Sequence, residues 1–192
     1  MKKPDLLLAL EPVVRALQEI DISYYLGGSV CSSAYGIPRA TLDIDIVADI
    51  DISHVNAFIR ALEGEFYVNA EMVRGAIEDK SSFNIIHLET MIKVDFFVPE
   101  DSPFEKEIFR RRRKEIIGES NEFYFASPED VILKKLDWYK RGGEISENQW
   151  NDVLGVLRVQ GSALDMEYLN SWASRLNLVD LLDKATTEVQ ES

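Results

Sequence analysis

The sequence predicts an α/β (α+β) fold, with an α/β lobe over residues 1–126 followed by an α-helical lobe over residues 127–192. In the first part of the chain, short β-rich runs alternate with stretches whose apolar residues recur at helical spacing. After "EFYFA" this pattern changes, and the chain from about 127 to 190 has the spacing of helices throughout. A chain of 192 residues is long enough for one domain with a smaller second lobe.

Side-chain spacing and turn residues predict the elements of the first lobe. In chain order they are a helix at 5–20, a strand at 22–26 ending at Gly27-Gly28, a helix at 29–35, a strand at 41–48 ("TLDIDIVA"), a helix capped by Ser53 and ending at Gly64, and strands at 82–88 and 91–98. Because the turn between the last two strands is tight, we expect them to form a hairpin.

Residues typical of helix starts predict where the helices of the second lobe begin. Ser127 is placed to cap a helix that has Pro128 at its first position and acidic residues in its first turn. Ser146 and Gln149 have the spacing of a capping box at the start of a second helix. The three tryptophans of this lobe lie at helical spacing, and we expect them in its core.

Charge and composition exclude several classes of protein. The formal net charge is −13, which argues against broad, non-specific nucleic-acid binding, because such binding needs an excess of Lys and Arg. The single cysteine, Cys31, excludes an internal disulfide framework and suits a reducing compartment. No apolar run approaches the roughly 18 residues of a membrane span. We therefore expect a cytoplasmic protein.

Two aspartates stand on an otherwise apolar predicted strand. Asp43 and Asp45 share one face of "TLDIDIVA", with Cα atoms about 6.5–7 Å apart, so both carboxylates can reach one ion. A divalent cation would remove their mutual repulsion, and Mg²⁺ commonly binds through one or two carboxylates plus substrate phosphates. The alternative is a solvent-facing edge strand that carries incidental acids.

Two neighbouring features favour the metal interpretation. In "LGGS", paired glycines before a helix let backbone N–H groups approach a phosphate, although such a sequence is often only a turn. Asp95 is a lone acid in the apolar strand "IKVDFFV"; its alternative interpretation is a strand-edge charge paired with Lys93 or an arginine. Together with Asp43 and Asp45, these features indicate a metal–phosphate site.

Other site types fail on spacing. An EF-hand loop starting at Asp43 would need glycine where Ala48 stands, and the Walker A and G-x-G-x-x-G patterns do not occur. Two histidines and one cysteine cannot build a typical structural zinc site. A serine nucleophile elbow is also missing, and we expect His87, in an apolar strand, to be a satisfied core or surface histidine rather than a base.

The stretch "LGGSVCSSAYGIPRATLDIDIV" resembles the signature of the DNA polymerase β-type nucleotidyltransferase superfamily. That signature is a Gly-Gly/Ser turn, a spacer and an Asp-h-Asp-h strand, with a third acid on a later strand. Within it, "R-x-T-x-D-I-D", together with the later "SPEDVILKKLDWY" and "QWNDVLGVL", is similar to the AbiEii-like group, which includes toxins of bacterial toxin–antitoxin pairs. The similarity covers roughly residues 22–155, and Asn151-Asp152 stands where that group usually has an Arg/Lys-Asp pair.

The resemblance implies a nucleotidyltransferase-like mixed twisted sheet flanked by helices, with a C-terminal helical lobe. It implies a Mg²⁺-dependent reaction that moves a nucleoside monophosphate from an NTP to an acceptor hydroxyl. Asp43 and Asp45 would hold Mg²⁺ on the triphosphate. Asp95 would complete a second metal position and help to deprotonate the acceptor, so that these three acids are both the metal ligands and the catalytic residues.

The resemblance also implies a set of nucleotide-binding residues. Gly28 and Ser29 would cradle the β- and γ-phosphates, and Arg39 and Thr41 lie just before the metal strand. Lys135 aligns with the lysine of the helical block and would contact a phosphate; its alternative is a solvated lysine on a helix surface.

The partners follow from the same resemblance: an NTP, an acceptor that is a tRNA, a protein or a small molecule, and an antitoxin. The alternative function is a catalytically inactive nucleotidyltransferase-fold binding or regulatory module of a toxin–antitoxin-like system. Because this chain keeps all three acids, the enzyme is favoured. The arginines in "FRRRRKE" (109–115) would bind an RNA acceptor or nucleotide phosphates, or else offset nearby glutamates.

Overall fold

The computed structural model describes residues 4–117 and 121–191. Its elements, in chain order, are α1 (Asp5–Glu19), β1 (Tyr24–Leu26), α2 (Gly28–Tyr35), β2 (Asp43–Ala48), α3 (Val55–Leu62), β3 (Phe66–Tyr67), α4 (Ala70–Glu78), β4 (Ser82–His87), β5 (Lys93–Phe97), α5 (Pro103–Arg111), β6 (Arg113–Ile117), β7 (Asn121–Phe125), α6 (Pro128–Arg141), α7 (Glu147–Gln160), a 3₁₀ turn (Gly161–Ala163), α8 (Met166–Arg175) and α9 (Val179–Glu191). Within these ranges, no helix is both long and apolar enough to cross a membrane.

The chain divides into two compact units. Unit 1 comprises Met1–Gly27 and Thr41–Phe125, and unit 2 comprises Gly28–Ala40 and Ala126–Ser192. The sequence-based division at 126/127 lies one residue from the point, between Phe125 and Ala126, where the chain passes from unit 1 to unit 2 for the last time. It assigned residues 28–40 to the first lobe, whereas in the structure α2 and the loop after it group with the C-terminal helices.

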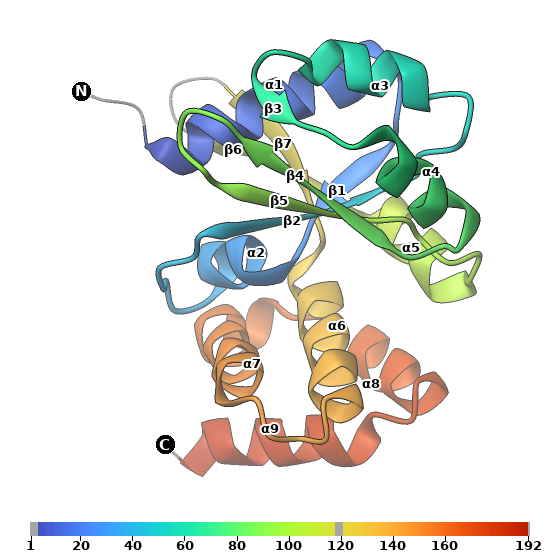
Figure 1. The fold of residues 1–192 in the computed structure, drawn as a ribbon. Helices are drawn as coiled ribbons and strands as arrows, with labels where there is room; N and C mark the ends of the chain where they lie inside the picture. Colours follow the sequence, from blue (N-terminus) through green and yellow to red (C-terminus); the bar gives the residue numbers. More distant parts are fainter. Residues whose placement is uncertain (1–3, 118–120, 192) are drawn as a thin grey trace. The chain divides into compact units, whose positions relative to one another are not determined.

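Unit 1 is built on a mixed sheet whose seven described strands have the order β3-β4-β5-β2-β1-β7-β6 (Figure 1). β2 pairs with β5 in parallel and with β1 in antiparallel orientation, and β4 and β5 form the predicted hairpin. β2 is therefore the central strand, and the alternative that its aspartates lie on a solvent-facing edge strand is wrong. The mixed sheet flanked by helices that we predicted is confirmed.

The alternation of side chains gives the sheet an apolar face. Ile44 and Ile46 of β2 and Phe96 of β5 are fully buried on that face. Phe58 of α3 packs its ring edge-on against Phe96, with ring centroids 5.3 Å apart, and α1 and α3 lie over the same side of the sheet (Figure 1). Burial of these large apolar side chains fixes which way every strand residue points, because a shift by one residue would expose the core.

On the opposite face, α5 covers the end of the sheet where β1 and β2 pair through Tyr25 and Val47. The ring of Tyr25 packs against Phe109, and its hydroxyl donates a hydrogen bond of 2.9 Å to the buried Glu105 of α5. The aspartates of β2 lie on this same face, farther toward the start of the strand.

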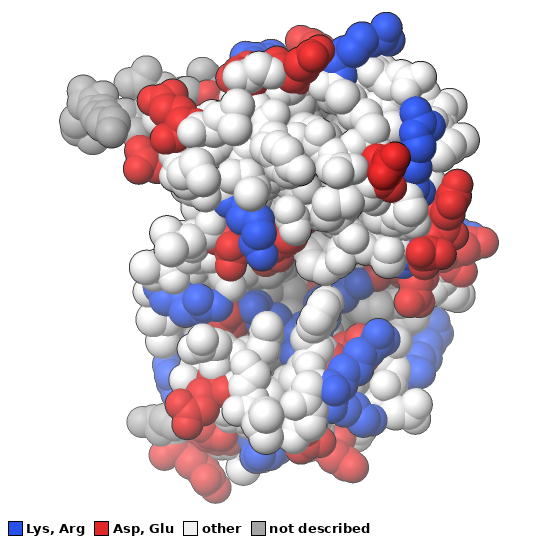
Figure 2. All heavy atoms as spheres, in the orientation of Figure 1, with Lys and Arg blue, Asp and Glu red and all other residues white. Residues whose placement is uncertain are grey.

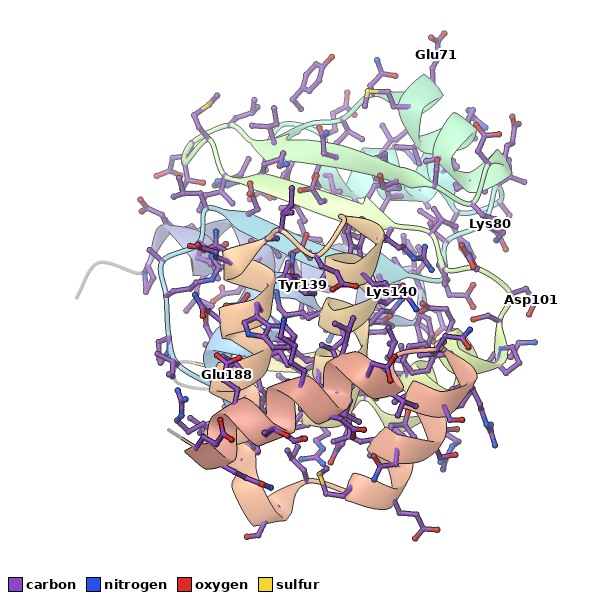
Figure 3. All side chains as sticks on the ribbon, turned by 90° about the horizontal axis from the view of Figure 1, so that it is seen from below. Glu71, Lys80, Asp101, Tyr139, Lys140 and Glu188 are labelled. Atoms are coloured by element: carbon purple, nitrogen blue, oxygen red, sulfur yellow. The ribbon has the colours of Figure 1, made fainter. Side chains whose placement is uncertain are left out.

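Unit 2 is helical, as the sequence predicted for its C-terminal part, and α2 packs against α7. A Cβ atom on Gly36 would lie 2.7 Å from the backbone nitrogen of Val156, and one on Gly155 would lie 3.1 Å from the nitrogen of Ile37. Glycine at these two positions therefore permits the close approach of the two segments. At the other end of α7, the Trp150 indole donates to Glu188 of α9 at 3.1 Å (Glu188 is labelled in Figure 3).

The predicted caps of the second lobe are largely confirmed. Ser127 caps α6 and Ser146 caps α7, each accepting a hydrogen bond from the backbone three residues later. The side chain of Gln149 accepts a hydrogen bond from Lys135 at 3.0 Å, so it serves the packing of α6 on α7 rather than a reciprocal capping box.

Two sequence-based predictions are wrong. Ser53 does not cap α3, because its backbone nitrogen and hydroxyl both donate to the Asp51 carboxylate, and α3 starts at Val55. The three tryptophans do not lie in the core: Trp138 is 55% exposed on α6, and Trp150 and Trp172 are only half-buried. Helical spacing alone did not show which side of α6 would be covered.

Candidate active site

The parallel pairing of β2 with β5 determines where the predicted catalytic acids lie. The register places Asp45 directly opposite Asp95, and Asp43 directly opposite Lys93. Residues opposite each other in adjacent strands point to the same side, so the three carboxylates share the face that is not covered by α1 and α3. The register therefore places the three predicted acids on one face of the sheet, and their roles as metal ligands and catalytic residues stay predictions.

Lys93 lies among these acids. Its ammonium is 2.8 Å from a carboxylate oxygen of Asp95 and 3.8 Å from one of Asp43. The hydrogen bond to Asp95, followed by the charges of Asp95, Asp43 and Asp45, raises the pKa of Lys93. The Asp95 side chain is 20% exposed, and those of Lys93 and Asp43 are about half exposed, so the cluster is accessible to small ions. Both ideas about Asp95 therefore hold: it pairs with Lys93 and it faces the other two acids.

The arrangement and the donor atoms of these residues determine whether they suit a divalent cation. In the described part of the chain, no three His, Cys, Asp or Glu side chains are already arranged as a metal-binding group. On the acidic face of the sheet, the ammonium of Lys93 lies against the carboxylates of Asp95 and Asp43. Carboxylate oxygens are the ligands that Mg²⁺ prefers, so the donor atoms of these residues are of the type that such an ion takes.

Hydrogen bonds fix the backbone at the start of β2 and at the end of β1. The Thr41 hydroxyl donates to the carbonyl of Asp43 at 3.1 Å, and the Asp43 nitrogen lies 3.4 Å from the same hydroxyl, so Thr41 fixes the start of the strand. At the end of β1, the nitrogen of Gly27 donates to the carbonyl of Asp45 at 2.9 Å. The next residue, Gly28, has φ +54°, a left-handed conformation that favours glycine, and it begins α2.

In unit 2, the other predicted nucleotide-binding residues belong to one ion-pair network. The guanidinium of Arg39 binds the two carboxylate oxygens of Asp152 at 2.9 and 3.1 Å, and it also donates to the hydroxyl of Ser29. This two-pronged contact is the geometry that suits arginine and carboxylate best. The loop after α2 is thereby held against α7.

Lys135 completes the network from α6. Its ammonium lies 2.7 Å from Asp152 and donates to Gln149 at 3.0 Å, and both Lys135 and Asp152 are buried. The alternative interpretation, in which Lys135 is a solvated lysine on a helix surface, is therefore wrong, and its contact with a phosphate stays a prediction. Burial acts to raise the pKa of Asp152, but the hydrogen bonds from Arg39 and Lys135 and their positive charges outweigh it and lower that pKa. The side chains of Arg39, Lys135 and Asp152 together carry one net positive charge.

Sequence reasoning placed neither Asp152 nor Lys93 among the metal ligands or nucleotide-binding residues, although it expected Asp152 to orient a basic residue, as its ion pairs with Arg39 and Lys135 confirm. For Asp152, a signal was present: Lys135 has Val131, Ile132 and Tyr139 at positions i−4, i−3 and i+4, which are all buried. A lysine on the apolar face of a helix needs an acidic partner. For Lys93, the signal was its spacing of two residues from Asp95, which places both on one face of the strand.

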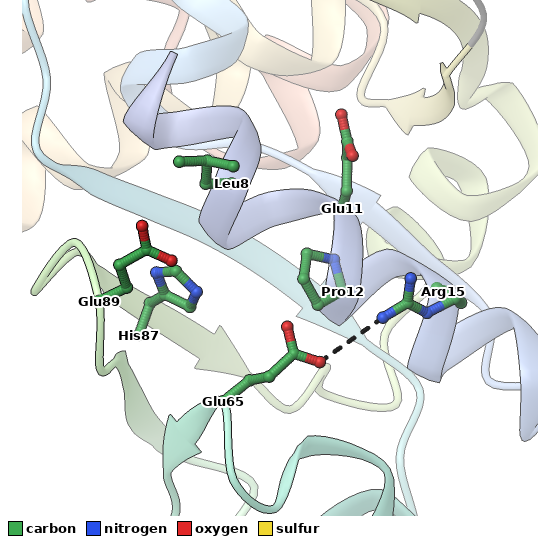
Figure 4. A pocket seen from close by; sticks show the side chains of 7 residues that line it. All are labelled: Leu8, Glu11, Pro12, Arg15, Glu65, His87 and Glu89. Carbon is green, nitrogen blue, oxygen red and sulfur yellow. Dashed lines mark ion pairs between the residues drawn. The ribbon is translucent and has the colours of Figure 1, made fainter. Parts of the chain in front are cut away.

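A pocket in unit 1 lies apart from the predicted site residues. It has a volume of about 170 Å³ and is lined by Leu8, Glu11, Pro12, Arg15, Glu65, His87 and Glu89 (Figure 4). His87 is buried, and its Nδ1 accepts a hydrogen bond from the Thr90 nitrogen and lies 2.8 Å from the Thr90 hydroxyl. The prediction that His87 is a satisfied histidine is confirmed.

The basic cluster is divided between the end of α5 and β6. Arg110 forms an ion pair with Glu107, and Lys114 pairs with Glu122 at 2.7 Å. The guanidinium of Arg112 lies 4.8 Å from the centre of the Tyr124 ring. Figure 2 likewise shows Lys and Arg interspersed with Asp and Glu on the visible face rather than gathered in one patch. These contacts support the interpretation that the cluster offsets nearby acids.

Comparisons with known proteins agree with this fold. No family model and no curated protein matches the sequence. The solution structure of the antibiotic-resistance factor ANT(2'')-Ia is similar, with a TM-score of 0.55 at 11% identity over 93% of this chain and 97% of that chain. The crystal structure of ANT(2'')-Ia in complex with adenylyl-2''-tobramycin gives a TM-score of 0.55 at 9% identity, over 90% and 97% of the two chains. The lincomycin-bound lincosamide antibiotic adenylyltransferase LnuA gives 0.45 at 16% identity, over 77% and 93%.

At these identities the similarity establishes the fold, which is nucleotidyltransferase-like, as the sequence predicted. Within that class, the AbiEii-like subgroup stays a prediction.

Proposed function

We propose that this protein is a Mg²⁺-dependent nucleotidyltransferase that moves a nucleoside monophosphate from an NTP to an acceptor hydroxyl. The observation that carries the proposal is the convergence of Asp43, Asp45 and Asp95 on one face of the central strands β2 and β5. A purely structural role would not explain why three like charges gather on adjacent strands, where they repel each other.

The acids of unit 1 are proposed as metal ligands. Asp43 and Asp45 would hold Mg²⁺ on the triphosphate, and Asp95 would share in the second metal position and accept the proton of the acceptor hydroxyl. When bound, the metal would polarise the α-phosphate and neutralise the charge that develops on the attacking and leaving oxygens. Thr41 supports this arrangement by fixing the backbone of Asp43.

The network of unit 2 is proposed to bind the phosphates. The hydroxyl of Ser29 and the backbone N–H groups at Gly28 are suited to phosphate oxygens, since they open a helix. Arg39 and Lys135 supply positive charge, and Asp152 holds both in place while cancelling only one of their two charges. In this proposal Asp152 is a positioning residue.

The acceptor classes are a tRNA, a protein and a small molecule. ANT(2'')-Ia has been crystallised with adenylyl-2''-tobramycin, so an aminoglycoside hydroxyl is the first small-molecule acceptor to test. An antitoxin partner also stays a prediction.

The test is transfer of label from α-³²P-NTPs, with Mg²⁺, to tRNA, to protein extract and to aminoglycosides, together with release of pyrophosphate. Asp95→Asn should reduce turnover by roughly a hundredfold or more, because it removes a metal ligand. Asp49→Asn is the matched control: Asp49 is exposed and comes directly after β2, so its loss should leave turnover unchanged. Equal turnover of Asp95→Asn and wild type would refute the proposal. A complete lack of label transfer to all acceptors would favour the inactive binding module instead.

A further inference from the structure

Four charged residues of β2 and β5 share the acidic face of the sheet. Lys93 and Asp95 lie two residues apart on β5 and point to the same side, opposite Asp43 and Asp45 of β2. One ammonium and three carboxylates leave two negative charges, which is the charge that one divalent cation neutralises. The group therefore carries its own partial substitute for a metal ion.

We propose that Lys93 is a resident counter-cation: it neutralises part of the charge at Asp95 in the metal-free protein and competes there with a divalent cation. The inference rests on the proposed function, since it concerns the same three carboxylates. It assigns Lys93 the role of a positioning residue that keeps the acids together without metal and sets how tightly metal binds.

Two features of Lys93 make this exchange physically reasonable. Its contact with Asp95, at 2.8 Å, is the shorter of its two ion pairs with the acids, so its positive charge opposes the approach of a divalent cation to the same carboxylate. The side chain is 43% exposed, and its flexible four-carbon stem can turn the ammonium into solvent. Displacement therefore requires no movement of the sheet.

The experiment compares wild type with Lys93→Met, which matches the unbranched stem of lysine but lacks the ammonium, and with Lys93→Arg, which keeps the charge. The probe is Mn²⁺ alone, without nucleotide, and its binding is followed by electron paramagnetic resonance of the free ion. Lys114→Met is the matched control, because Lys114 forms an ion pair of 2.7 Å with Glu122 on β6 and β7, away from the acids of β2 and β5.

We expect Lys93→Met to tighten Mn²⁺ binding about tenfold, because a unit charge about 4 Å from the ligands no longer competes. Lys93→Arg and Lys114→Met should bind Mn²⁺ as wild type does. In the metal-free protein at low salt, Lys93→Met should melt at a lower temperature than wild type, and adding Asp95→Asn to it should recover part of the loss, because one of the unbalanced carboxylates is removed.

The outcomes separate this inference from the proposed function. If all variants bind Mn²⁺ with the affinity of wild type, Lys93 does not compete with metal and the inference is overturned, while the metal site itself stands. If neither wild type nor Lys93→Met binds Mn²⁺, the inference and the metal-dependent function are overturned together. If Lys114→Met tightens binding as much as Lys93→Met, the effect is one of overall charge, and the inference is again overturned.

Discussion

Replacement of Asp152 by asparagine tests the ion-pair network of unit 2. The substitution keeps the shape of the side chain and removes the charge that Lys135 and Arg39 share. Lys135 would then be a buried ammonium whose remaining described contact is the neutral side chain of Gln149. The structure therefore predicts a loss of stability much larger than that caused by a surface charge change.

The magnitude follows from the burial of each partner. Breaking a buried ion pair by removal of one partner costs about 3–5 kcal/mol, because the other charge stays buried without compensation. The lower end, about 3 kcal/mol, applies here because the Arg39 side chain is 35% exposed and can be hydrated when it loses Asp152. For a chain of this size, such a loss corresponds to a fall in Tm of about 6–12 °C.

The assay is urea unfolding at pH 7, followed by circular dichroism, with Asp137→Asn as the control. Asp137 pairs with Arg141 one turn later on the surface of α6, so its loss should cost less than about 1 kcal/mol. A loss below about 1 kcal/mol for Asp152→Asn, equal to that of the control, would refute the idea that a buried charge network holds α2, α6 and α7 together.

Two further predictions concern the same unit. Because the pKa of Asp152 is lowered in the folded protein, this group stabilises the fold above its unfolded pKa of about 3.9, and that stability is lost as the pH falls toward the folded pKa. Wild type should therefore lose stability below about pH 4 more steeply than Asp152→Asn. Parallel acid-unfolding curves of the two proteins would contradict this. Gly36→Ala should destabilise the protein by about 1–3 kcal/mol, because the added Cβ would meet the backbone of Val156. The control is Gly75→Ala in α4, where the added Cβ meets nothing within 4 Å, so it should be neutral or stabilising in the same urea titration. Equal effects of the two substitutions would show that the close approach does not depend on glycine.

Local sequence patterns predicted the elements that depend on local chemistry. The alternation of "TLDIDIVA" correctly gave a strand with both aspartates on one face, and Ser127 with Pro128 correctly gave the start of α6. These features depend on residues within one turn or one strand, so periodicity and capping rules are sufficient to find them. The three acids of the candidate site could be selected in this way.

Pairings between distant segments could not be predicted from such patterns. The register that sets Asp45 opposite Asp95 joins strands fifty residues apart, and a slip of one residue would have turned Asp95 to the other face. Residues 28–40 group with the C-terminal helices, where Arg39 meets Asp152, more than a hundred residues later in the chain. The missed cap at Ser53 has a different cause, since the competing carboxylate of Asp51 lies only two residues away.

The central claim, that the acidic face of β2 and β5 binds a metal–nucleotide complex, is tested most directly by calorimetric titration with a non-hydrolysable NTP analogue. Wild-type protein should bind the analogue in the presence of Mg²⁺ and much more weakly with EDTA, and Asp45→Asn should lose the dependence on Mg²⁺. Binding that is the same with and without Mg²⁺, in wild type and in Asp45→Asn alike, would contradict the assignment of these carboxylates as metal ligands.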